Sequence, residues 1–478
     1  MKKQLRAPHM AFLAATMLAG CANMAGIAPQ ASLRDAASLG IHPAAAGEAG
    51  VDADWWRNLG DPQLDRLVEQ ALQSNPTLKV AQARLARALA VTEVANAASL
   101  PQVNGALDLT RQRYTATGAV PPPLAGAIRE SGTAQFTTSW EIDFFGKNQA
   151  ALDAALDTAQ AAQADEQAAR SLLTSNVVRA YLQLARVNDL ATVSERTLAQ
   201  RSESLALVQD RVRAGLDTQL ELRQSEGALP EARQQLEGLH EQAVLAQNAL
   251  AALVGEGNRQ VVATAPSLSG LKSLPGPRDL PADLLGRRAD IAAARWRVEA
   301  AGHDVKNAKA QFYPNVNLTA FVGLSSIGLN RLLEAGSQQW GFGPAVRLPI
   351  FEAGRLRANL RGKTADFDAA VESYNQAVID AVRETADQLA SARSIERQLT
   401  EQQAAQGAAE AAWQIAQQRY KAGLGTYLNV LAAETAVLSQ RRLAVDLAAR
   451  ALDAQVGLVR ALGGGYSPDR ASPALAAR

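Results

Sequence analysis

The sequence predicts a mainly α-helical chain with a small β part, in which one structural plan occurs twice. Residues 149–213 contain neither proline nor glycine and are rich in alanine, which favours a very long helix. Four short segments alternate apolar and polar residues, the pattern typical of strands with one buried face. Three motifs recur later in the chain in the same order. Such self-similarity indicates internal duplication.

The N-terminus has the features of an export signal. Basic residues come before an apolar run at 11–18, and small residues then lead to Cys21, the only cysteine of the chain. Secretory signal peptides have this order of basic, apolar and small residues. We therefore predict a signal peptide at 1–20.

Cys21 has no second cysteine with which to form an internal disulfide. The string Leu-Ala-Gly-Cys at 18–21 resembles the lipobox of bacterial lipoproteins. The resemblance implies cleavage before Cys21 and covalent attachment of N-palmitoyl and S-diacylglycerol groups to it, and several acyl chains make a stable anchor. Ala22, where retained lipoproteins have aspartate, implies transport to the outer membrane. The alternative is an ordinary signal peptide with a chance cysteine.

Charge and hydropathy exclude two classes of protein. Lys and Arg number 48 against 47 Asp and Glu, so the chain lacks the basic excess of a nucleic-acid-binding protein. Beyond the signal peptide, no run approaches the roughly 18 apolar residues that a membrane helix needs. If the mature chain crosses a membrane, it does so as strands.

The duplicated motifs define two repeats, which we place at 63–254 and 281–462. The three pairs of matching segments are 83–104 with 296–317, 145–147 with 353–355, and 209–218 with 417–426. The remaining parts are the acylated N-terminal and equatorial segment 21–62, the equatorial insertion 255–280 and the C-terminal tail 463–478.

Each repeat is predicted to contain a helical hairpin, at 149–254 and 355–462. At about 1.5 Å per residue, the first helix of each would be roughly 95 Å long, far more than a globular core requires. The string Ala-Gly-Leu follows each long helix and supplies a glycine able to end it in a left-handed conformation. Return helices are expected at Thr218–Val254 and Thr426–Leu462. Pro230 lies inside the first of these and predicts a kink or a local break.

The alternating segments predict strands at about 103–113, 134–145, 316–325 and 339–351, near the 9–11 residues that a tilted strand needs to cross a bilayer. A soluble sheet with one buried face gives the same alternation. Four strands cannot close a membrane barrel, and an open sheet edge cannot lie in lipid. The polar strand faces, the lipid anchor and the long rods favour an oligomer whose polar faces line a common lumen.

An ordered series of short motifs resembles the TolC-like outer membrane factors, specifically the NodT-type lipoproteins of resistance-nodulation-division (RND) efflux systems. The resemblance covers essentially the whole mature chain. The motifs are Asp-Trp-Trp at 54–56, Gly-Asp-Pro-Gln-Leu at 60–64, Ser-Trp-Glu-Ile-Asp-Phe-Phe-Gly at 139–146, Leu-Pro-Ala-Asp-Leu-Leu-Gly-Arg-Arg-Ala-Asp-Ile at 280–291, Phe-Tyr-Pro at 312–314, Ile-Phe-Glu-Ala-Gly-Arg at 350–355 and Ala-Leu-Gly-Gly-Gly at 461–465.

The resemblance implies a homotrimer. Its twelve strands would close one transmembrane β-barrel, and its hairpins would form an α-barrel through the periplasm, with 255–280 and both termini in an equatorial belt. It also implies three kinds of partner, namely a periplasmic membrane-fusion adaptor, an inner-membrane RND pump and outer-membrane lipid. No cofactor is implied apart from the lipid on Cys21.

Two groups of site residues also follow from the resemblance. The hairpin tips match segments that dock the adaptor, through Arg211, Arg213, Ala214, Gly215, Leu216, Arg419, Lys421, Ala422, Gly423 and Leu424. The candidates for a periplasmic gate are Asp210, Tyr420, Tyr427 and Leu428. Several relatives have an aspartate where this chain has Ala432, so an acidic ring at that level lacks its residue here. From the residues alone, the tips could equally be ordinary turns with solvated arginines.

The sequence shows few of the residue arrangements on which enzymes rely. The histidines beyond the signal lie far apart along the chain and show no metal-ligand spacing or catalytic order. No phosphate-binding loop occurs. Glu141 and Asp143 lie on the same strand face, but a charged lumen explains them more simply than glycosidase chemistry does. We predict no enzymatic activity.

The sequence therefore predicts a passive, trimeric outer-membrane exit duct that expels small molecules or drugs and is coupled through an adaptor to an RND pump. One alternative is a type I protein-secretion duct. An alternative of another class is a lipid-anchored periplasmic coiled-coil adaptor or scaffold, but adaptors lack two alternating strand pairs. The exported substrate cannot be predicted, because the pump makes most of the selection.

Overall fold

The structure is a computed structural model that describes residues 23–34, 51–257, 261–262, 264–274 and 284–466. Cys21, the signal peptide, part of the insertion (258–260, 263 and 275–280) and the C-terminal tail beyond Tyr466 lie outside the described residues. The chain is mainly helical with one small sheet, as predicted. In the described part of the chain, no helix is both long enough and apolar enough to span a bilayer.

The chain divides into two compact units. The first unit consists of residues 1–33, 85–162 and 294–375, and the second consists of 34–84, 163–293 and 376–478. Because each unit draws on three separate stretches of sequence, several long helices contribute residues to both. The helices are α2 (Pro62–Ser74), α3 (Pro76–Ala97), α4 (Lys147–Arg213), α5 (Gln219–Leu253), α6 (Ala289–Ala310), α7 (Arg355–Lys421) and α8 (Tyr427–Ala461), with short 3-10 turns η2 (Trp55–Leu59), η3 (Leu268–Gly270), η4 (Leu284–Arg287), η5 (Leu329–Arg331) and η6 (Ala335–Ser337).

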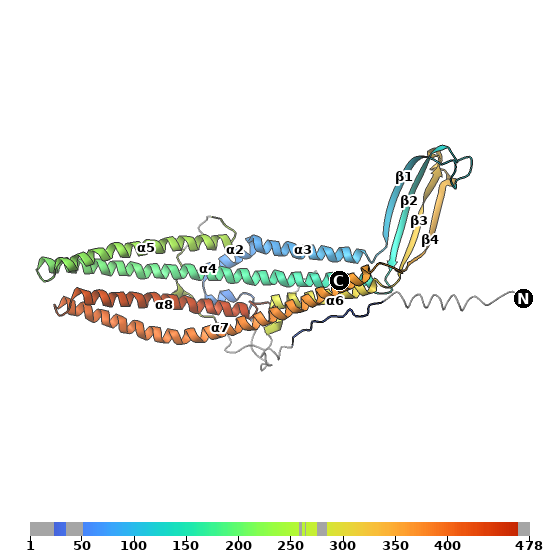
Figure 1. The fold of residues 1–478 in the computed structure, drawn as a ribbon. Helices are drawn as coiled ribbons and strands as arrows, with labels where there is room; N and C mark the ends of the chain where they lie inside the picture. The colour runs from blue at the N-terminus through green and yellow to red at the C-terminus, as the bar shows by residue number, and fades with distance from the viewer. Residues whose placement is uncertain (1–22, 35–50, 258–260, 263, 275–283, 467–478) are drawn as a thin grey trace. The chain divides into compact units, whose positions relative to one another are not determined.

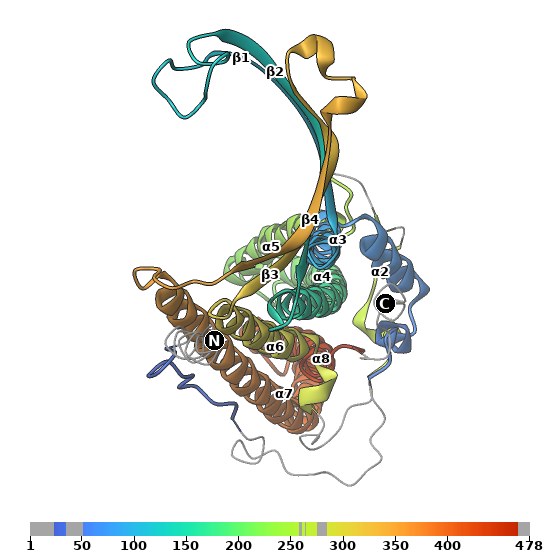
Figure 2. The same cartoon turned by 90° about the vertical axis from the view of Figure 1, so that its right-hand side faces the viewer.

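The first unit carries a four-stranded antiparallel sheet in the order β1-β2-β3-β4 (Figure 1; Figure 2). Its strands are β1 (Gln102–Arg113), β2 (Ile128–Ile142), β3 (Asn315–Ile327) and β4 (Gln338–Arg347). Glycines lie opposite large rings: Gly105 pairs with Phe136, and Gly341 pairs with Phe321. A Cβ atom at Gly341 would come within 2.7 Å of the Phe321 ring, so a side chain there would have to displace the ring.

Three strand limits differ clearly from the sequence-based expectation, namely both ends of β2 and the end of β4. β2 begins at Ile128, well before the expected 134, because its first residues pair with the end of β1 although they alternate poorly. It also ends at Ile142, because Asp143 turns to accept hydrogen bonds from backbone N–H groups at the start of α4. β4 ends at Arg347, before the expected 351, where Pro349 has no N–H to donate to a ladder.

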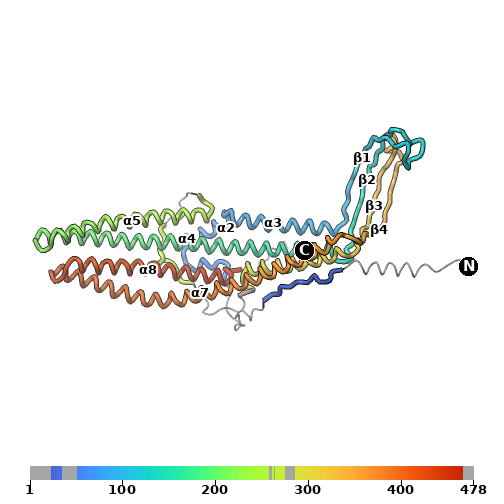
Figure 3. The backbone as a smooth tube through the Cα atoms, in the orientation of Figure 1, coloured from blue at the N-terminus to red at the C-terminus, as the bar shows by residue number. Residues whose placement is uncertain are grey.

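The second unit contains two helical hairpins, made by the distal part of α4 with α5 and the distal part of α7 with α8 (Figure 3). The long helices have 67 residues each and the return helices 35 each. Thr218 caps α5 reciprocally with Glu221, which explains its sharp start. α5 runs through Pro230 without the local break that the proline suggested.

The apolar core of the second unit gathers around Tyr181 of α4, which is fully buried. Trp55 and Trp56 of η2 and the apolar face of α2 pack into the same cluster. The Tyr181 hydroxyl donates to Asp61 at 2.5 Å and accepts from Gln63, so the start of α2 is fastened to α4.

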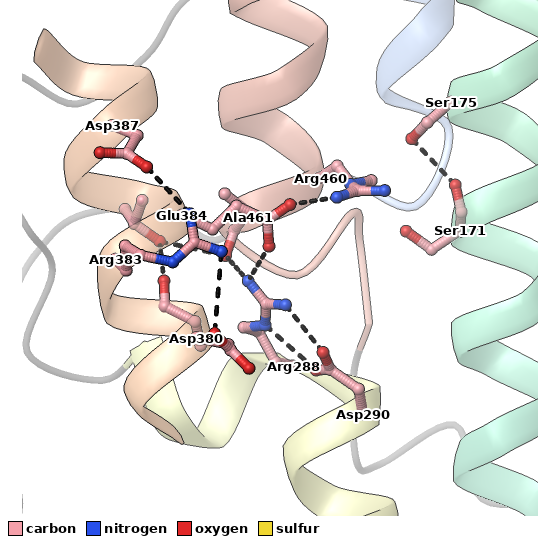
Figure 4. A network of polar contacts seen from close by, with 12 residues as sticks. Ser171, Ser175, Arg288, Asp290, Asp380, Arg383, Glu384, Asp387, Arg460 and Ala461 are labelled. Carbon is pink, nitrogen blue, oxygen red and sulfur yellow. Dashed lines mark hydrogen bonds and ion pairs between the residues drawn. The ribbon is translucent and has the colours of Figure 1, made fainter. Parts of the chain in front are cut away.

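A buried arginine organises a polar network in the same unit (Figure 4). Arg288 donates to Asp290 at 2.7 Å, to Glu384 of α7 at 3.0 Å and to the carbonyl of Ala461 at 3.0 Å. Arg460 donates to the same Glu384. Burial opposes ionisation of Glu384, but the two arginines outweigh it and lower its pKa. The network joins the segment before α6 to α7 and to the end of α8.

Candidate functional site: the hairpin tips

Both hairpins of the second unit turn through the same backbone motif. Gly215 and Gly423 have φ values of +71° and +75°, in the left-handed region that favours glycine. The N–H of Leu216 donates to the carbonyl of Arg211, and that of Leu424 donates to the carbonyl of Arg419. These are the hydrogen bonds of a Schellman helix end. Ala-Gly-Leu therefore ends both long helices where the sequence places the turns.

Each tip exposes a pair of leucines. Leu216 and Leu424 are 64% and 68% exposed, directly after the two glycines. One turn into the return helices, Leu220 and Leu428 are 63% and 62% exposed. Exposed leucines repeated at matching places in two hairpins offer a matched pair of apolar contacts to a partner.

Most of the remaining predicted tip residues are also exposed. Ala214, Ala422 and Lys421 lie at the surface. Arg213 is exposed and pairs with Asp210, one turn earlier on α4. Arg419 is exposed and donates to the carbonyl of Leu424 at 3.2 Å. An exposed ion pair of this kind contributes little stability, so these cations can exchange partners readily.

Arg211 is different, because its side chain lies inside the chain. Its guanidinium donates to the two oxygens of Asp217 at 2.9 and 3.2 Å and lies 4.6 Å from the centre of the Tyr420 ring. The Tyr420 hydroxyl also donates to Asp217. We call Arg211, Asp217 and Tyr420 the tip cluster. The cluster joins α4 and its turn to the end of α7, so Arg211 is directed inward and not toward a partner.

The tip cluster favours an ionised carboxylate. Burial opposes the ionisation of Asp217, but hydrogen bonds from Arg211 and Tyr420 outweigh it and hold the pKa below the ordinary value. Burial and the hydrogen bond to Asp217 raise the pKa of Tyr420, which therefore stays a neutral donor. The cluster keeps this charge state at neutral pH.

The two tyrosines proposed for the gate are buried between the hairpins. Tyr420 and Tyr427 are 2% and 3% exposed, with ring centres 5.8 Å apart, and they pack with Val208 and Val430. Within a single chain they therefore contribute to the packing of the two hairpins against each other and present no open ring surface. Leu428, by contrast, is exposed.

The acidic residues near the proposed gate also divide into exposed and buried ones. Asp210 is exposed and paired with Arg213. Ala432 lies at the surface, whereas nearby Glu434 is buried. The exposed Ala432 carries no carboxylate, and the buried Glu434 does not supply one at that surface.

A second arginine of α4 links the hairpins farther from the tip. Arg201 donates to the carbonyl of Ala228 at 2.8 Å and to Glu231 of α5 at 3.2 Å. It also donates to Glu434 of α8 at 3.1 Å, and both side chains of that pair are only 8% exposed. Burial raises the pKa of Glu434 in spite of Arg201. One buried cation thus holds α4, α5 and α8 together.

Three residues of this site escaped the sequence analysis, namely Asp217, Arg201 and Leu220. Leu220 could have been found, because it occupies the position in the first hairpin that Leu428 occupies in the second. Asp217 and Arg201 gave no local signal, since an aspartate after a turn and an arginine in a helix are ordinary surface residues. Their partners come from other helices.

The carboxylates that could suggest catalysis have structural partners. Glu141 lies 2.6 Å from the Lys147 ammonium, and Asp143 accepts from the backbone N–H groups of Lys147 and Gln149. Among the described residues, no group of His, Cys, Asp and Glu is arranged to hold a metal ion. The candidate site therefore consists of exposed residues at the tips and of contacts between helices.

Comparison with known proteins identifies the family of the chain. The profile of the outer membrane efflux protein family matches residues 67–256 and again 280–464. The fusaric acid resistance protein FusA of Burkholderia cepacia is 40% identical over 366 residues, 74% of this chain and 69% of FusA. The pyoverdine export outer membrane protein OpmQ of Pseudomonas aeruginosa is 33% identical over 89% of this chain and 90% of OpmQ.

Among solved structures, the outer membrane protein VceC of Vibrio cholerae is similar, with a TM-score of 0.82 and 35% identity over 87% of this chain and 100% of that chain. Sequence and fold thus agree over nearly the whole described chain. The protein belongs to the outer membrane efflux protein family.

Proposed function

We propose that this protein is the passive exit channel of a tripartite RND-type efflux system, carrying small molecules across the periplasm and the outer membrane. The observation that carries the proposal is the match of both halves of the chain to the outer membrane efflux family. The names of its relatives, which concern fusaric acid resistance and pyoverdine export, support small molecules as the cargo. Energy would come from the pump.

In this proposal, the functional form of the protein is a homotrimer. The sheet has two outer strands, β1 and β4, and neither pairs with a further strand in the described part of the chain. Every residue of β1 is exposed in the single chain. Open edges are untenable in lipid, so the strands need other chains, and three chains supply enough of them for one closed membrane barrel.

The adaptor would dock at the hairpin tips. The exposed leucines Leu216 and Leu424 supply apolar contacts, and the exposed cations Arg213, Arg419 and Lys421 supply charges that can meet carboxylates on the partner. Gly215 and Gly423 leave open space where a side chain would stand, which allows a partner helix to approach closely. Arg211 is not among these docking residues, because its guanidinium binds Asp217 in the tip cluster.

The lipid anchor completes the proposal. Acylated Cys21 would attach the mature chain to the outer membrane that its strands already cross. We expect Cys21→Ser to weaken targeting and assembly more than conduction. Complete loss of trimers after independent delivery to the outer membrane would contradict this order.

The proposal is tested by deleting the gene and measuring drug tolerance and retention of a fluorescent dye. Cells without the protein should retain more dye, and the wild-type gene should restore export. Gene copies with Leu216→Asp and Leu424→Asp should fail to restore export while trimers still form. The deletion is made in a strain that also lacks related channels. Unchanged export in that strain would overturn the proposal.

A further inference from the structure

The four strands share one largely apolar face, which we call the lipid face. Directly paired residues of antiparallel strands lie on the same face, so the register places Phe136 beside Val322 and Val322 beside Trp340. All three side chains are exposed in the single chain. Other exposed apolar residues of this face include Val103, Leu107, Leu109, Trp140, Phe342 and Val346. An exposed apolar face of this extent is the side of the sheet that lipid would contact.

The charged residues of the lipid face are confined to one end of it. Within the four strands they are Arg111 and Arg113, at the end of β1, and Glu130, near the start of β2. At this end loops join β1 to β2 and β3 to β4, whereas helices join the strands at the other end (Figure 1). The turn between β3 and β4 adds Arg331 and Glu334, one charge of each sign. An excess of positive charge therefore remains at the loop end.

The two arginines of β1 are available to a ligand. Arg111 lies 3.7 Å from Glu130, beyond hydrogen-bond length, and its side chain is 73% exposed. Arg113 lies opposite Ile128 and has no ion pair in the described part of the chain. Residues two apart on a strand are separated by about 7 Å. Two guanidinium groups on one face can therefore reach neighbouring anionic groups of a single ligand.

The turn between β3 and β4 extends the apolar surface beside these arginines. A Cβ atom at Gly132, which pairs with Leu109 on the lipid face, would meet the side chains of Leu329 and Leu332 at 3.0 Å. The turn therefore folds over the lipid face. Its Leu333 is 86% exposed. Exposed apolar surface and exposed cations thus occur together at the loop end.

The spacing along β2 matches the thickness of a membrane's apolar layer. Trp140 lies near the helix end of the lipid face, where its indole N–H donates to the carbonyl of Ser99 at 2.9 Å. From Trp140 to Glu130 the strand is about 34 Å long, or about 26 Å along the membrane normal at a tilt of about 40°. The apolar band of a membrane barrel is about 25 Å tall. Since tryptophan is favoured at a membrane boundary, Arg111, opposite Glu130, lies at the other boundary.

We propose that Arg111 and Arg113 bind the phosphate groups of a phosphorylated glycolipid in the outer leaflet of the outer membrane, with Leu333 and the lipid face against its acyl chains. Lipopolysaccharide is a glycolipid of this class, since its sugar phosphates lie directly above its acyl chains. A guanidinium binds a phosphate through paired N–H donors. The inference deepens the proposed function and rests on the membrane position of the strands proposed there.

The first test measures the binding of defined lipids to the full-length protein, purified from outer membranes in detergent, by native mass spectrometry. The probe is bisphosphorylated lipid A, and the comparison is the same glycolipid without phosphates. We expect the parent to bind the phosphorylated form at least about tenfold more tightly, because charge-assisted hydrogen bonds are strong. Equal binding of the two glycolipids would overturn the proposal. Displacement of lipid A by an equal concentration of inorganic phosphate would also overturn it.

The second test uses variants. Arg111→Ser with Arg113→Ser should bind bisphosphorylated lipid A as weakly as the parent binds the dephosphorylated form. Arg129→Ser is the matched control, because Arg129 pairs with Gln112 on the opposite face of the sheet, and it should bind like the parent. Binding by the double variant equal to that of the parent, or an equal loss in Arg129→Ser, would overturn the proposal.

A third variant guards against loss of binding through misfolding. Glu130→Gln removes the one carboxylate of the lipid face within the strands. Bisphosphorylated lipid A should then bind about threefold more tightly, because the arginines lose a competing charge. A misfolded protein cannot produce this gain. Weaker binding by Glu130→Gln would overturn the assignment of the arginines as the phosphate site.

These results are separable from a test of the proposed function. Dye export by cells reports on the channel, whereas lipid binding reports on the site. Normal export by a parent that does not discriminate between the two glycolipids would overturn the site alone. Phosphate-dependent binding by a protein that does not export would contradict the channel and leave the site standing.

Discussion

Arg211 and Tyr420 lie on different hairpins, yet the guanidinium of Arg211 lies 4.6 Å from the centre of the Tyr420 ring. Both side chains also donate hydrogen bonds to one carboxylate, that of Asp217. Any motion that separates the end of α7 from the end of α4 must break these contacts. The tip cluster therefore acts as a fastening between the hairpins, while the exposed leucines remain available to a partner.

Removing the shared carboxylate should loosen this fastening. Asp217→Ala leaves Arg211 and Tyr420 without their common acceptor, and a buried donor without a partner is costly. We expect higher single-channel conductance in planar bilayers, with trimers intact by cross-linking. Glu226→Ala is the control, because it removes only the pair with the exposed Arg223 and should conduct like the parent. Equal conductance in both variants would argue against a fastening role.

The second prediction concerns the left-handed turn at Gly423. A Cβ atom there meets nothing within 4 Å, so Gly423→Val acts through backbone strain at φ +75°, about 1–3 kcal/mol for a non-glycine residue. Drug export should fall while trimers persist, since the strain is confined to the tip. Gly425→Ala, at a glycine without positive φ, should leave export unchanged. Full export by Gly423→Val would show that the turn geometry is dispensable.

The conductance of the proposed channel should also depend on pH through the tip cluster. The pKa of Asp217 is lowered from its ordinary value of 3.8, so its stabilising contribution is fully present above about pH 4 and is lost as pH falls through the lowered value. We expect constant conductance between about pH 8 and pH 5 and a rise only below about pH 4. Asp217→Ala should lack that acid transition. A transition of the parent near neutral pH would assign the fastening to another group.

A further prediction concerns stability. Arg288→Ala removes the donor that joins Asp290, Glu384 and the carbonyl of Ala461, and loss of one partner from a buried pair costs about 3 kcal/mol. Thermal unfolding in detergent should occur at a clearly lower temperature. Arg383→Ala removes an arginine whose side chain is 65% exposed and should barely change the unfolding temperature. Similar melting of the two variants would mean that burial of Arg288 has no energetic consequence.

Local patterns predicted much of the architecture. The helix turns at Gly215 and Gly423 follow from one glycine at the end of a long proline-free stretch, and the return helices begin and end within one residue of the expected limits. The start of β2 was missed, because residues from Ile128 onward become a strand only by pairing with β1. Strand pairing is a tertiary effect that alternation cannot report.

The chemistry of the tips was less predictable for the same reason. Arg211 and Arg419 occupy matching places in the two repeats, yet the Arg211 side chain pairs with Asp217 and is only 13% exposed, whereas Arg419 is exposed. The repeats differ at both partner positions, because Gly425 matches Asp217 and Val212 matches Tyr420, so the second repeat lacks the carboxylate acceptor. The sequence does not show that Tyr420 of one hairpin packs against Arg211 of the other, because that contact is tertiary.

The most direct test of the proposed channel is planar-bilayer recording of the protein purified from outer membranes. We predict that cross-linking detects trimers, that Asp217→Ala with Tyr420→Phe opens stable ion-conducting channels, and that the parent conducts less under the same voltage. Purification as a monomer, with no conductance from either protein, would contradict the assignment of this chain as an exit channel.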